Sequence, residues 1–423
     1  MPARHALLPR LPRDAWVVLG GDTLSAVGSG LTLPFFLVYL TRVRGIDVAV
    51  GGLALSTVAL AGFAGNPFAG WLTDRVGAKR ALEGGLVVAA AGAFLVTLVR
   101  EPWHAFVAAA VVGCGAAVIW PAQDALLATV VAPAERSSAF AMRNATLNAG
   151  YGLGGLGASL IADLSSPASF VTLYVVDGLT FLAFVPILAR LLPHAGGTAS
   201  AAGSPAAPER AATYRTVLRD RVFLRVWVLI ALLVTIGFSQ TQAGFPAYAT
   251  STGGISAAGL GVAFAANTFT VVAAQLVVLR LMEGRRRTTG IILACLCWGA
   301  AWAVTLASGT LGGGAVAVLA FSTAMVVFAL GETLLAPSQA ALVNDLAPDD
   351  LRGRYNGLYT LAWTTGFALG PVIAGVALEA GNGTALFGGL IAACGLAAVA
   401  AARLARHLPP TVNVVALQRR APL

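Results

Sequence analysis

The sequence predicts an all-α membrane protein with twelve transmembrane helices in two six-helix, pseudo-symmetric halves. Hydrophobic residues make up 58% of the chain and charged residues only 11%, and the mean hydropathy is +0.82. A water-soluble domain has a charged fraction of about 25%. The apolar runs are long and continuous, whereas the strands of a membrane barrel alternate apolar and polar residues. We therefore expect helices that cross the membrane many times.

Twelve apolar segments are long enough for transmembrane helices, each of which needs about 20 residues. They cover residues 15–40, 48–73, 81–99, 104–128, 138–161, 169–191, 223–248, 256–281, 288–308, 313–341, 356–378 and 384–405. Pro34 in the first segment and Pro246 in the seventh are expected to kink their helices, because proline lacks the N–H that continues the hydrogen-bond ladder.

A change of composition divides the twelve segments into two sets of six. Residues 193–213 are rich in Gly, Ala, Ser and Pro, which predicts a flexible linker. We therefore expect an N-terminal half at 1–192, a cytoplasmic linker at 193–222, and a C-terminal half with a cytoplasmic tail at 223–423.

An internal repeat supports this division. A shift of 216 residues aligns Pro121 with Pro337, Gln123 with Gln339, Arg136 with Arg352, Gly150 with Gly366 and Gly154 with Gly370. These identities fall in one unbroken register. Parallel half-repeats related by an axis along the membrane normal are one way in which secondary transporters are built, with the substrate held near the midplane.

The distribution of basic residues predicts the orientation of the chain. Most lie in the tails and in the even-numbered loops, and only Arg42, Arg44 and Arg100 fall on the other face. By the positive-inside rule both termini are cytoplasmic, in a multi-pass protein of the cell (inner) membrane. The net charge of +9 then reflects contact with anionic membrane lipids and requires no nucleic-acid partner. We expect a monomer.

The loop between the second and third segments carries dense charge. It reads Gly70-Trp-Leu-Thr-Asp74-Arg75-Val-Gly77-Ala-Lys79-Arg80. Gly77 permits a tight turn, and Asp74 is followed by three cations that can pair with it. The spacing resembles the signature of the major facilitator superfamily, Gly-x-x-x-Asp-Arg-x-Gly-x-Lys-Arg, at every position. The resemblance implies the major facilitator fold and a cytoplasmic gate in this loop.

The fourth segment contains an acid on the same membrane face as this loop. Asp124 lies near its cytoplasmic end and is expected to pair with Arg75 or Arg80 as part of the gate. Proteins of this family often have an arginine in the body of the fourth helix that is linked to proton coupling. Residues 103–131 contain none, so the family's coupling scheme does not transfer directly.

Glycines follow one face of the fifth and eleventh segments. Gly150 and Gly154 lie in the fifth, and Gly366, Gly370 and Pro371 in the eleventh. Small residues let helix backbones approach closely, so this is a helix-packing motif. It resembles the glycine-rich antiporter motif of drug-efflux facilitators, Gly-x-x-x-Gly-Pro-x-x-Gly-Gly, with the better match in the eleventh segment.

Two acids inside the segments are the candidates for proton coupling. An ionised carboxylate at membrane depth costs about 2.5 to 3.5 kcal/mol on insertion scales and is by default a functional hypothesis. Glu332 has no Lys or Arg in its own segment, and it precedes Pro337 as in the tenth helix of the drug-proton antiporters, which this stretch resembles. Asp22 is either an auxiliary proton site or a structural acid. Asp177, in the sixth segment, is expected to be satisfied by a neighbouring helix.

Other polar and aromatic residues are candidates for the substrate cavity. They are Trp120, Arg143, Tyr151, Gln240, Gln242, Tyr359 and Trp363. Arg143 has two options, to reach the cytoplasmic surface or to pair with Asp22. The two glutamines line a cavity or bind helix to helix. Trp298, Trp302 and Phe328 add aromatic surface.

No chemistry of an enzyme stands out. The cysteines, Cys114, Cys295, Cys297 and Cys394, all fall inside predicted helices, where disulfides and metal sites are unlikely to form. We identify no catalytic residues, no metal ligands and no cofactor, and no phosphate-binding glycine loop.

The resemblance to drug-proton antiporters implies a secondary transporter that exports lipophilic or amphipathic compounds in exchange for protons by alternating access. Its partners are a small-molecule substrate, protons and membrane lipids. One alternative is a proton-coupled symporter that takes up a small polar metabolite. A second, from another class, is a membrane enzyme or a sensor that transports nothing.

Overall fold

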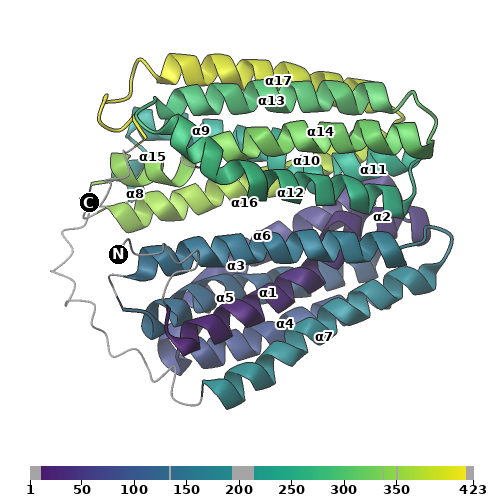
Figure 1. Ribbon diagram of the computed structural model, residues 1–423, viewed down its shortest axis with the longest axis horizontal. Helices are drawn as coiled ribbons and strands as arrows, with labels where there is room; N and C mark the ends of the chain where they lie inside the picture. The colour runs from purple at the N-terminus through teal and green to yellow at the C-terminus, as the bar shows by residue number, and fades with distance from the viewer. Residues whose placement is uncertain (1–10, 133–134, 193–213, 337, 349–350, 416–423) are drawn as a thin grey trace, which may run out of the picture. The chain divides into compact units, whose positions relative to one another are not determined.

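The structure, a computed structural model, describes residues 11–132, 135–192, 214–336, 338–348 and 351–415. In these ranges the regular structure is helical, apart from one isolated antiparallel bridge between Arg286 and Val414 (Figure 1). Helices suit a lipid environment because they satisfy every backbone polar group within the segment. The prediction of an all-α membrane protein is confirmed.

Eleven helical stretches in the described residues are long and apolar enough to cross a membrane. The fifth predicted segment, 138–161, corresponds to the 26-residue helix α6 (Arg136–Ile161), which is not among the eleven. Its length is sufficient, but Arg143, Asn144 and Asn148 lower its hydropathy. Because of these polar residues, we expect α6 to contribute to the functional site.

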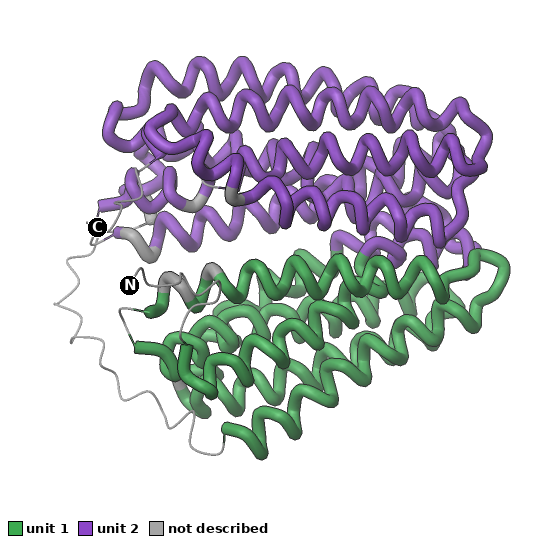
Figure 2. Tube along the Cα trace, viewed as in Figure 1, with its two compact units in different colours: residues 1–33, 57–205 green, residues 34–56, 206–423 purple. Residues whose placement is uncertain are grey.

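The chain divides into two compact units, residues Met1–Leu33 with Thr57–Pro205 and residues Pro34–Ser56 with Ala206–Leu423 (Figure 2). The predicted linker at 193–213 lies outside the described residues, so the expected boundaries remain a prediction. Beyond it come the short helix α8 (Tyr214–Val217) and then α9 (Arg221–Leu233). Pro34–Ser56, taken from the predicted first half, is grouped with the second unit.

Unit 1 is a bundle of long helices. They are α1 (Arg13–Thr32), the greater part of α3 (Val48–Val76), α4 (Ala78–Thr97), α5 (Pro102–Val130), α6 and α7 (Pro167–Leu191). Its core is mostly aliphatic, with Leu82, Leu126 and the aromatic Phe184 among the side chains packed between α4, α5 and α7.

Unit 2 holds the remaining elements. They are η1 (Leu33–Phe35, of which Pro34 and Phe35 belong to this unit), α2 (Phe36–Val38), η2 (Tyr39–Val43), the start of α3, α8, α9, η4 (Val234–Phe238), α10 (Ser239–Gln242), α11 (Gly244–Ser251), α12 (Ala257–Met282), α13 (Arg287–Ser308), α14 (Gly314–Leu335), α15 (Gln339–Leu346), α16 (Arg352–Glu379) and α17 (Gly383–Leu404). Its core contains fully buried aromatic rings, including Trp298, Trp302 and Phe328.

Both predicted proline kinks correspond to breaks in the helices. Pro34 lies in the 3₁₀ turn η1, which ends α1 and is followed by the π-helical turn η2. The seventh transmembrane segment is interrupted at Ala243, between α10 and α11. Pro246 follows three residues later, where its ring would clash with the carbonyl of Gln242 if the helix continued. The first and seventh segments therefore share a broken form.

In unit 2, residues 34–56, which include α2, η2 and the start of α3, pack on α16. Ser56 Oγ donates to the carbonyl of Ala368 at 2.7 Å, and the backbone N–H of Val48 donates to Glu379 Oε2 at 2.6 Å. A Cβ on Gly52 would lie 3.3 Å from the Cα of Gly375. Small residues thus allow two helix backbones to cross closely.

The glycines predicted to form a packing motif lie at close helix crossings in both units. In unit 1, a Cβ on Gly150 would lie 2.7 Å from the Cβ of Ala26, and one on Gly154 would collide with the carbonyl of Val27. Both contacts are with α1.

In unit 2, the corresponding glycines of α16 lie against the broken seventh segment. A Cβ on Gly366 would collide with Val234 of η4, and one on Gly370 would collide with the hydroxyl of Ser239 of α10. The repeated residues therefore occupy equivalent packing positions in the two units.

Gly154→Ala is expected to lower the thermal denaturation midpoint of the purified protein, because overpacking typically costs about 1–3 kcal/mol. Gly157→Ala is the matched control in the same helix. Its new Cβ would meet only the flexible end of Leu31, at 3.1 Å. Equal midpoints for the two variants, measured in the same detergent, would contradict the packing role of Gly154.

Candidate functional site

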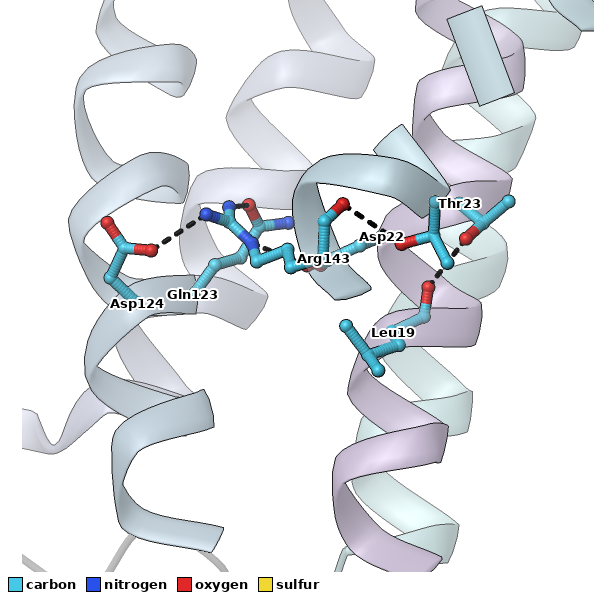
Figure 3. A network of polar contacts seen from close by, with 7 residues as sticks. Leu19, Asp22, Thr23, Gln123, Asp124 and Arg143 are labelled. Atoms are coloured by element: carbon cyan, nitrogen blue, oxygen red, sulfur yellow. Dashed lines mark hydrogen bonds and ion pairs between the residues drawn. The ribbon is translucent and has the colours of Figure 1, made fainter. Parts of the chain in front are cut away.

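Arg143 lies in the N-terminal half of α6 and is buried, with 6% of its surface exposed. Its Nε donates to Asp22 Oδ2 of α1 at 2.9 Å (Figure 3). Of the two options that the sequence left open, the structure shows the pair with Asp22. A guanidinium is weakly hydrated and holds its charge, so it is suited to a buried ion pair.

Three residues of α5 complete the surroundings of the guanidinium. Nη1 donates to Asp124 Oδ1 at 2.7 Å and Nη2 donates to Gln123 Oε1 at 2.6 Å (Figure 3). The guanidinium carbon lies 5.2 Å from the ring centroid of Trp120, within reach of a cation–π interaction. We call these five residues, Asp22, Trp120, Gln123, Asp124 and Arg143, the Arg143 cluster.

The expected partner of Asp124 was wrong. The sequence placed Asp124 beside Arg75 or Arg80 of the charged loop, but its carboxylate meets Arg143. Asp124 lies one helical turn beyond Trp120, and both side chains lie on the face of α5 that meets Arg143 of α6. The carboxylate of Asp124 therefore pairs with Arg143 and not with a cation of the loop between α3 and α4.

The two carboxylates of the cluster differ in environment. Asp22 is fully buried, and its Oδ1 has no hydrogen-bond partner among the described residues. The side chain of Asp124 is 52% exposed. With both acids ionised, one guanidinium faces two negative charges. One acid can therefore take up a proton while the other still pairs with Arg143.

The charged loop contains the predicted turn. Helix α3 ends at Val76, Gly77 has a φ of 87°, and α4 begins at Ala78. Lys79 Nζ donates to the carbonyl of Leu192 at 2.9 Å, and its nitrogen lies 3.9 Å from Glu83 Oε1. A positive φ favours glycine, which explains the residue at this position.

The other members of the predicted gate make fewer contacts. Arg75 lies over the ring of Trp71, 5.2 Å from its centroid. Arg80 is exposed, and a Cβ on Gly70 would meet nothing within 4 Å. The side chain of Asp74 lies outside what the structure describes, so its role in the gate remains a prediction.

Glu332 lies near the end of α14, among apolar neighbours. The side chain of Asn267, from α12, lies near its carboxyl group and donates to the carbonyl of Met325 at 3.3 Å. Among the described residues no Lys or Arg forms an ion pair with it. Its neighbour Gly331 packs on Trp298, where an added Cβ would lie 2.7 Å from the indole ring. The uncompensated acid that the sequence predicted is thus in place, and its coupling role remains a proposal.

The two glutamines of the seventh segment differ. Gln240 is fully buried, and its Nε2 donates to the carbonyls of Thr235 at 2.9 Å and of Gly370 at 3.2 Å. Gln240 therefore binds α10 to α16. Gln242 is half-buried and keeps its place as a cavity candidate.

The aromatic candidates separate by burial. Trp298, Trp302 and Phe328 are fully buried, so the expectation that they offer surface to a substrate was wrong. Their rings pack on one another, with Trp298 stacked on Phe328 at 5.0 Å between centroids. Dense packing of large rings is what fills the core of unit 2.

Three half-buried aromatic side chains, Phe238, Tyr359 and Trp363, lie next to this core. Trp363 stacks on Phe238 with centroids 5.0 Å apart, and Tyr359 lies edge-on to Trp363 at 6.3 Å. In unit 1, Tyr151 is also half-buried, and Trp120 is 47% exposed. Trp363 and Tyr359 were predicted, whereas Phe238 was missed.

Gln123 was also missed, although a signal for it was present. It is one of the five residues repeated at the 216-residue shift, where its counterpart is Gln339. Phe238 had no comparable signal, because its orientation depends on the π-helical turn η4, which no residue pattern predicted.

The long apolar helices and the buried charges between them are those of a multi-pass membrane transporter. Residues 18–329 and 254–422 match the model of the Major Facilitator Superfamily. The chain belongs to this family. Members of the family are transporters, so the protein is a secondary transporter and not an enzyme.

Curated relatives are distant. A Na(+), Li(+), K(+)/H(+) antiporter of Planococcus maritimus is 25% identical over 85% of this chain and 88% of its own length. The multidrug resistance protein MdtH of Yersinia pestis (strain Pestoides F) is 32% identical, but over only 30% of this chain and 33% of its own length.

Solved structures share the fold. A POT family transporter in complex with 5-aminolevulinic acid has a TM-score of 0.76 at 12% identity, over 95% of this chain and 97% of its own. The nucleoside transporter NupG has a TM-score of 0.73 at 12% identity, over 92% and 99%. At this identity the likeness shows the fold alone.

Arg143→Met is expected to destabilise the protein strongly, because removing one partner of a buried ion pair costs about 3–5 kcal/mol. It leaves Asp22 uncompensated. The double variant Asp22→Asn/Arg143→Met should recover part of the loss, and Asp124→Asn should cost less because Asp124 is half exposed. Thermal denaturation midpoints of the purified variants provide the measurement. A double variant no more stable than Arg143→Met would contradict the pairing energy assigned to Asp22.

Proposed function

We propose that the protein exports lipophilic or amphipathic compounds in exchange for protons. The observation that carries the proposal is that two carboxyl groups on described membrane-spanning helices, Asp177 and Glu332, form no ion pair among the described residues. Asp22, Asp124, Asp177 and Glu332 lie within these helices, and Arg143 is the cation that pairs with two of them. Such acids are expensive in a membrane and are by default functional.

Glu332 is the principal coupling residue in this proposal. Glu332 is half-buried and forms no ion pair with a cation among the described residues, so loss of its proton leaves a poorly solvated charge. Antiport requires a site whose protonation is linked to substrate occupancy, and linkage of this kind is reciprocal. A positively charged substrate that favours the ionised acid would therefore promote release of the proton.

The Arg143 cluster is the auxiliary site. Asp22 and Asp124 share one guanidinium, so the cluster can exchange a proton without leaving Arg143 unpaired. This replaces the arginine that the family often has in the body of the fourth helix. Here the cation comes from α6 and meets acids of α1 and α5.

The composition of the half-exposed residues supports the substrate class. Trp120, Tyr359 and Trp363 present aromatic surface, which suits a lipophilic compound, and aromatic faces attract cations. Together with the unpaired acids Asp177 and Glu332, this favours lipophilic cations. The name of the relative MdtH, a multidrug resistance protein, agrees with the proposal.

Orientation in the cell follows from charge. We place both termini in the cytoplasm of a cell with the protein in its inner membrane, because the basic residues gather on the face of the tails. In that placement the charged loop around Gly77 lies on the cytoplasmic face, beside anionic lipid headgroups. A monomer contains both repeats and needs no second copy.

A second candidate is the exchange of alkali cations for protons. The same uncompensated acids, Glu332 and Asp177, would suit a small cation as well as an organic one, and the relative from Planococcus maritimus is named as such an antiporter. Proteoliposomes with an internal acidic pH and a pH-sensitive dye separate the candidates. Collapse of the gradient by a lipophilic cation supports the first, and collapse by Na⁺, Li⁺ or K⁺ alone supports the second.

Glu332→Gln is expected to abolish export driven by a proton gradient while leaving substrate binding and folding nearly intact. The amide keeps the shape and the hydrogen-bonding capacity of the acid but cannot titrate. Efflux of a fluorescent lipophilic cation from energised vesicles is the measurement. Glu283→Gln, outside the spanning stretches, is the control and should transport at the rate of the wild type.

Exchange of labelled substrate in the absence of a gradient completes this test. Glu332→Gln should still exchange substrate, because alternating access does not itself require the proton. Gradient-driven efflux at the wild-type rate in Glu332→Gln would remove this residue from the coupling mechanism.

A further inference from the structure

Asp177 lies in the middle of α7 and is buried, with 6% of its surface exposed. Thr32 Oγ1, from α1, lies 2.8 Å from Asp177 Oδ2. Oδ1 has no hydrogen-bond partner among the described residues. The sequence predicted contact with a neighbouring helix, and the structure provides it, but that contact satisfies only half of the carboxyl group.

Among the described residues, no compensating charge lies beside Asp177. From α1, the side chain of Ser29 approaches the carboxyl group together with Thr32. From α6, Tyr151 is the titratable side chain that lies near it. From α4, Phe94 covers the neighbouring Gly178.

The charged residues of the packed helices lie elsewhere. Lys79, Arg80 and Glu83 are in the first turns of α4, and Arg143 is engaged with the acids of its own cluster. No ion pair includes Asp177 in the part of the chain that the structure describes. An ionised Asp177 would therefore be a desolvated anion with only the hydroxyls of Thr32 and Ser29 near it among the described residues.

The hydrogen bonds around Thr32 favour the neutral acid. Thr32 Oγ1 also lies 3.3 Å from the carbonyl of Ser29, but a hydroxyl has one hydrogen to donate. If Asp177 is ionised, that hydrogen goes to Oδ2 and the Ser29 carbonyl loses it. If Asp177 is protonated, Oδ2–H donates to Thr32 and Thr32 donates to Ser29. The second arrangement satisfies more groups and buries no charge.

The local backbone is shaped to receive this carboxyl group. Gly28 lies one helical turn before Thr32, and a Cβ there would lie 2.7 Å from Asp177 Oδ1 and collide with the Thr180 hydroxyl. Glycine therefore allows the acid to lie directly against the backbone of α1. Any larger residue at position 28 would push the acid away.

The contact also falls at the end of α1. Thr32 is the last residue of that helix, and the 3₁₀ turn Leu33–Phe35 follows. The division into units falls between Leu33 and Pro34. A movement of the chain at this break would withdraw Thr32 from Asp177.

We propose that Asp177, with Thr32 and Gly28 of α1, forms a third proton-binding site, distinct from Glu332 and the Arg143 cluster, that is occupied in this conformation and releases its proton to water when the end of α1 moves. The inference rests on the proposed proton coupling but concerns a different residue from Glu332. The ligand is a proton, bound to Oδ2. Its loss leaves the carboxylate, which the withdrawal of Thr32 opens to solvent.

Infrared spectroscopy of the purified protein in lipid nanodiscs tests occupancy directly. At neutral pH, the wild type minus Asp177→Asn difference spectrum should contain a carbonyl band of a protonated carboxylic acid. Thr32→Val should shift that band to higher wavenumber, because the acid loses its hydrogen-bond acceptor. Carboxylate bands in the first difference spectrum, or an unshifted band in Thr32→Val, would overturn the site. Thr32→Val keeps the acid, so the test holds even if Asp177→Asn fails to fold.

The number of protons moved per substrate tests whether Asp177 releases its proton during transport. In proteoliposomes, the reversal potential of the wild type gives the protons moved per substrate, and Asp177→Asn should move one fewer. An unchanged stoichiometry would overturn release during the cycle. Glu332→Gln distinguishes this from the proposed function, since it should lose driven export altogether. If the wild type moves no protons, proton coupling fails, and the infrared band still decides whether Asp177 holds a proton.

Discussion

Burial of the Arg143 guanidinium is the constraint on which unit 1 depends. A buried charge must be paired and hydrogen-bonded, and Arg143 uses donors on all three of its nitrogens to reach α1 and α5. The close crossing of α6 on α1 makes this possible. Gly150 and Gly154 follow Arg143 by seven and eleven residues, which places all three on one face of α6. The packing motif and the charge cluster are therefore parts of one helix contact.

Unit 2 repeats the packing without the cation. At the 216-residue shift, Gly366 and Gly370 keep the close crossing, but Tyr359 stands where Arg143 does. Gln339, the counterpart of Gln123, is buried with its Nε2 lacking a hydrogen-bond partner among the described residues. An aromatic side chain therefore occupies the position of the cation, and the carboxyl group of Glu332 in this unit has no ion-pair partner among the described residues. An arginine thus pairs with acids at this helix crossing in unit 1, whereas Glu332 of unit 2 forms no ion pair among the described residues.

Sequence predicted the fold because long apolar runs and a repeat register suffice to identify membrane helices and their pairing. It also identified Asp22 and Glu332, since an acid inside an apolar run is conspicuous. It failed for Asp124, whose partner depends on the rotation of α5, and for Trp298, whose burial depends on how four helices meet. It did identify α6, as the segment 138–161, although the polar residues of that helix lower its apolar character. Rotation and depth are properties of packing, which spacing along one helix does not determine.

The central claim is that the buried acids exchange protons for a cationic substrate. The most direct measurement adds a saturating lipophilic cation to purified protein in weakly buffered detergent solution with a pH indicator. The account predicts acidification, as ionised carboxyl groups become favoured beside the bound cation, and loss of most of that signal in Glu332→Gln. Binding of the cation, established by calorimetry on the same sample, without any change of pH would contradict it.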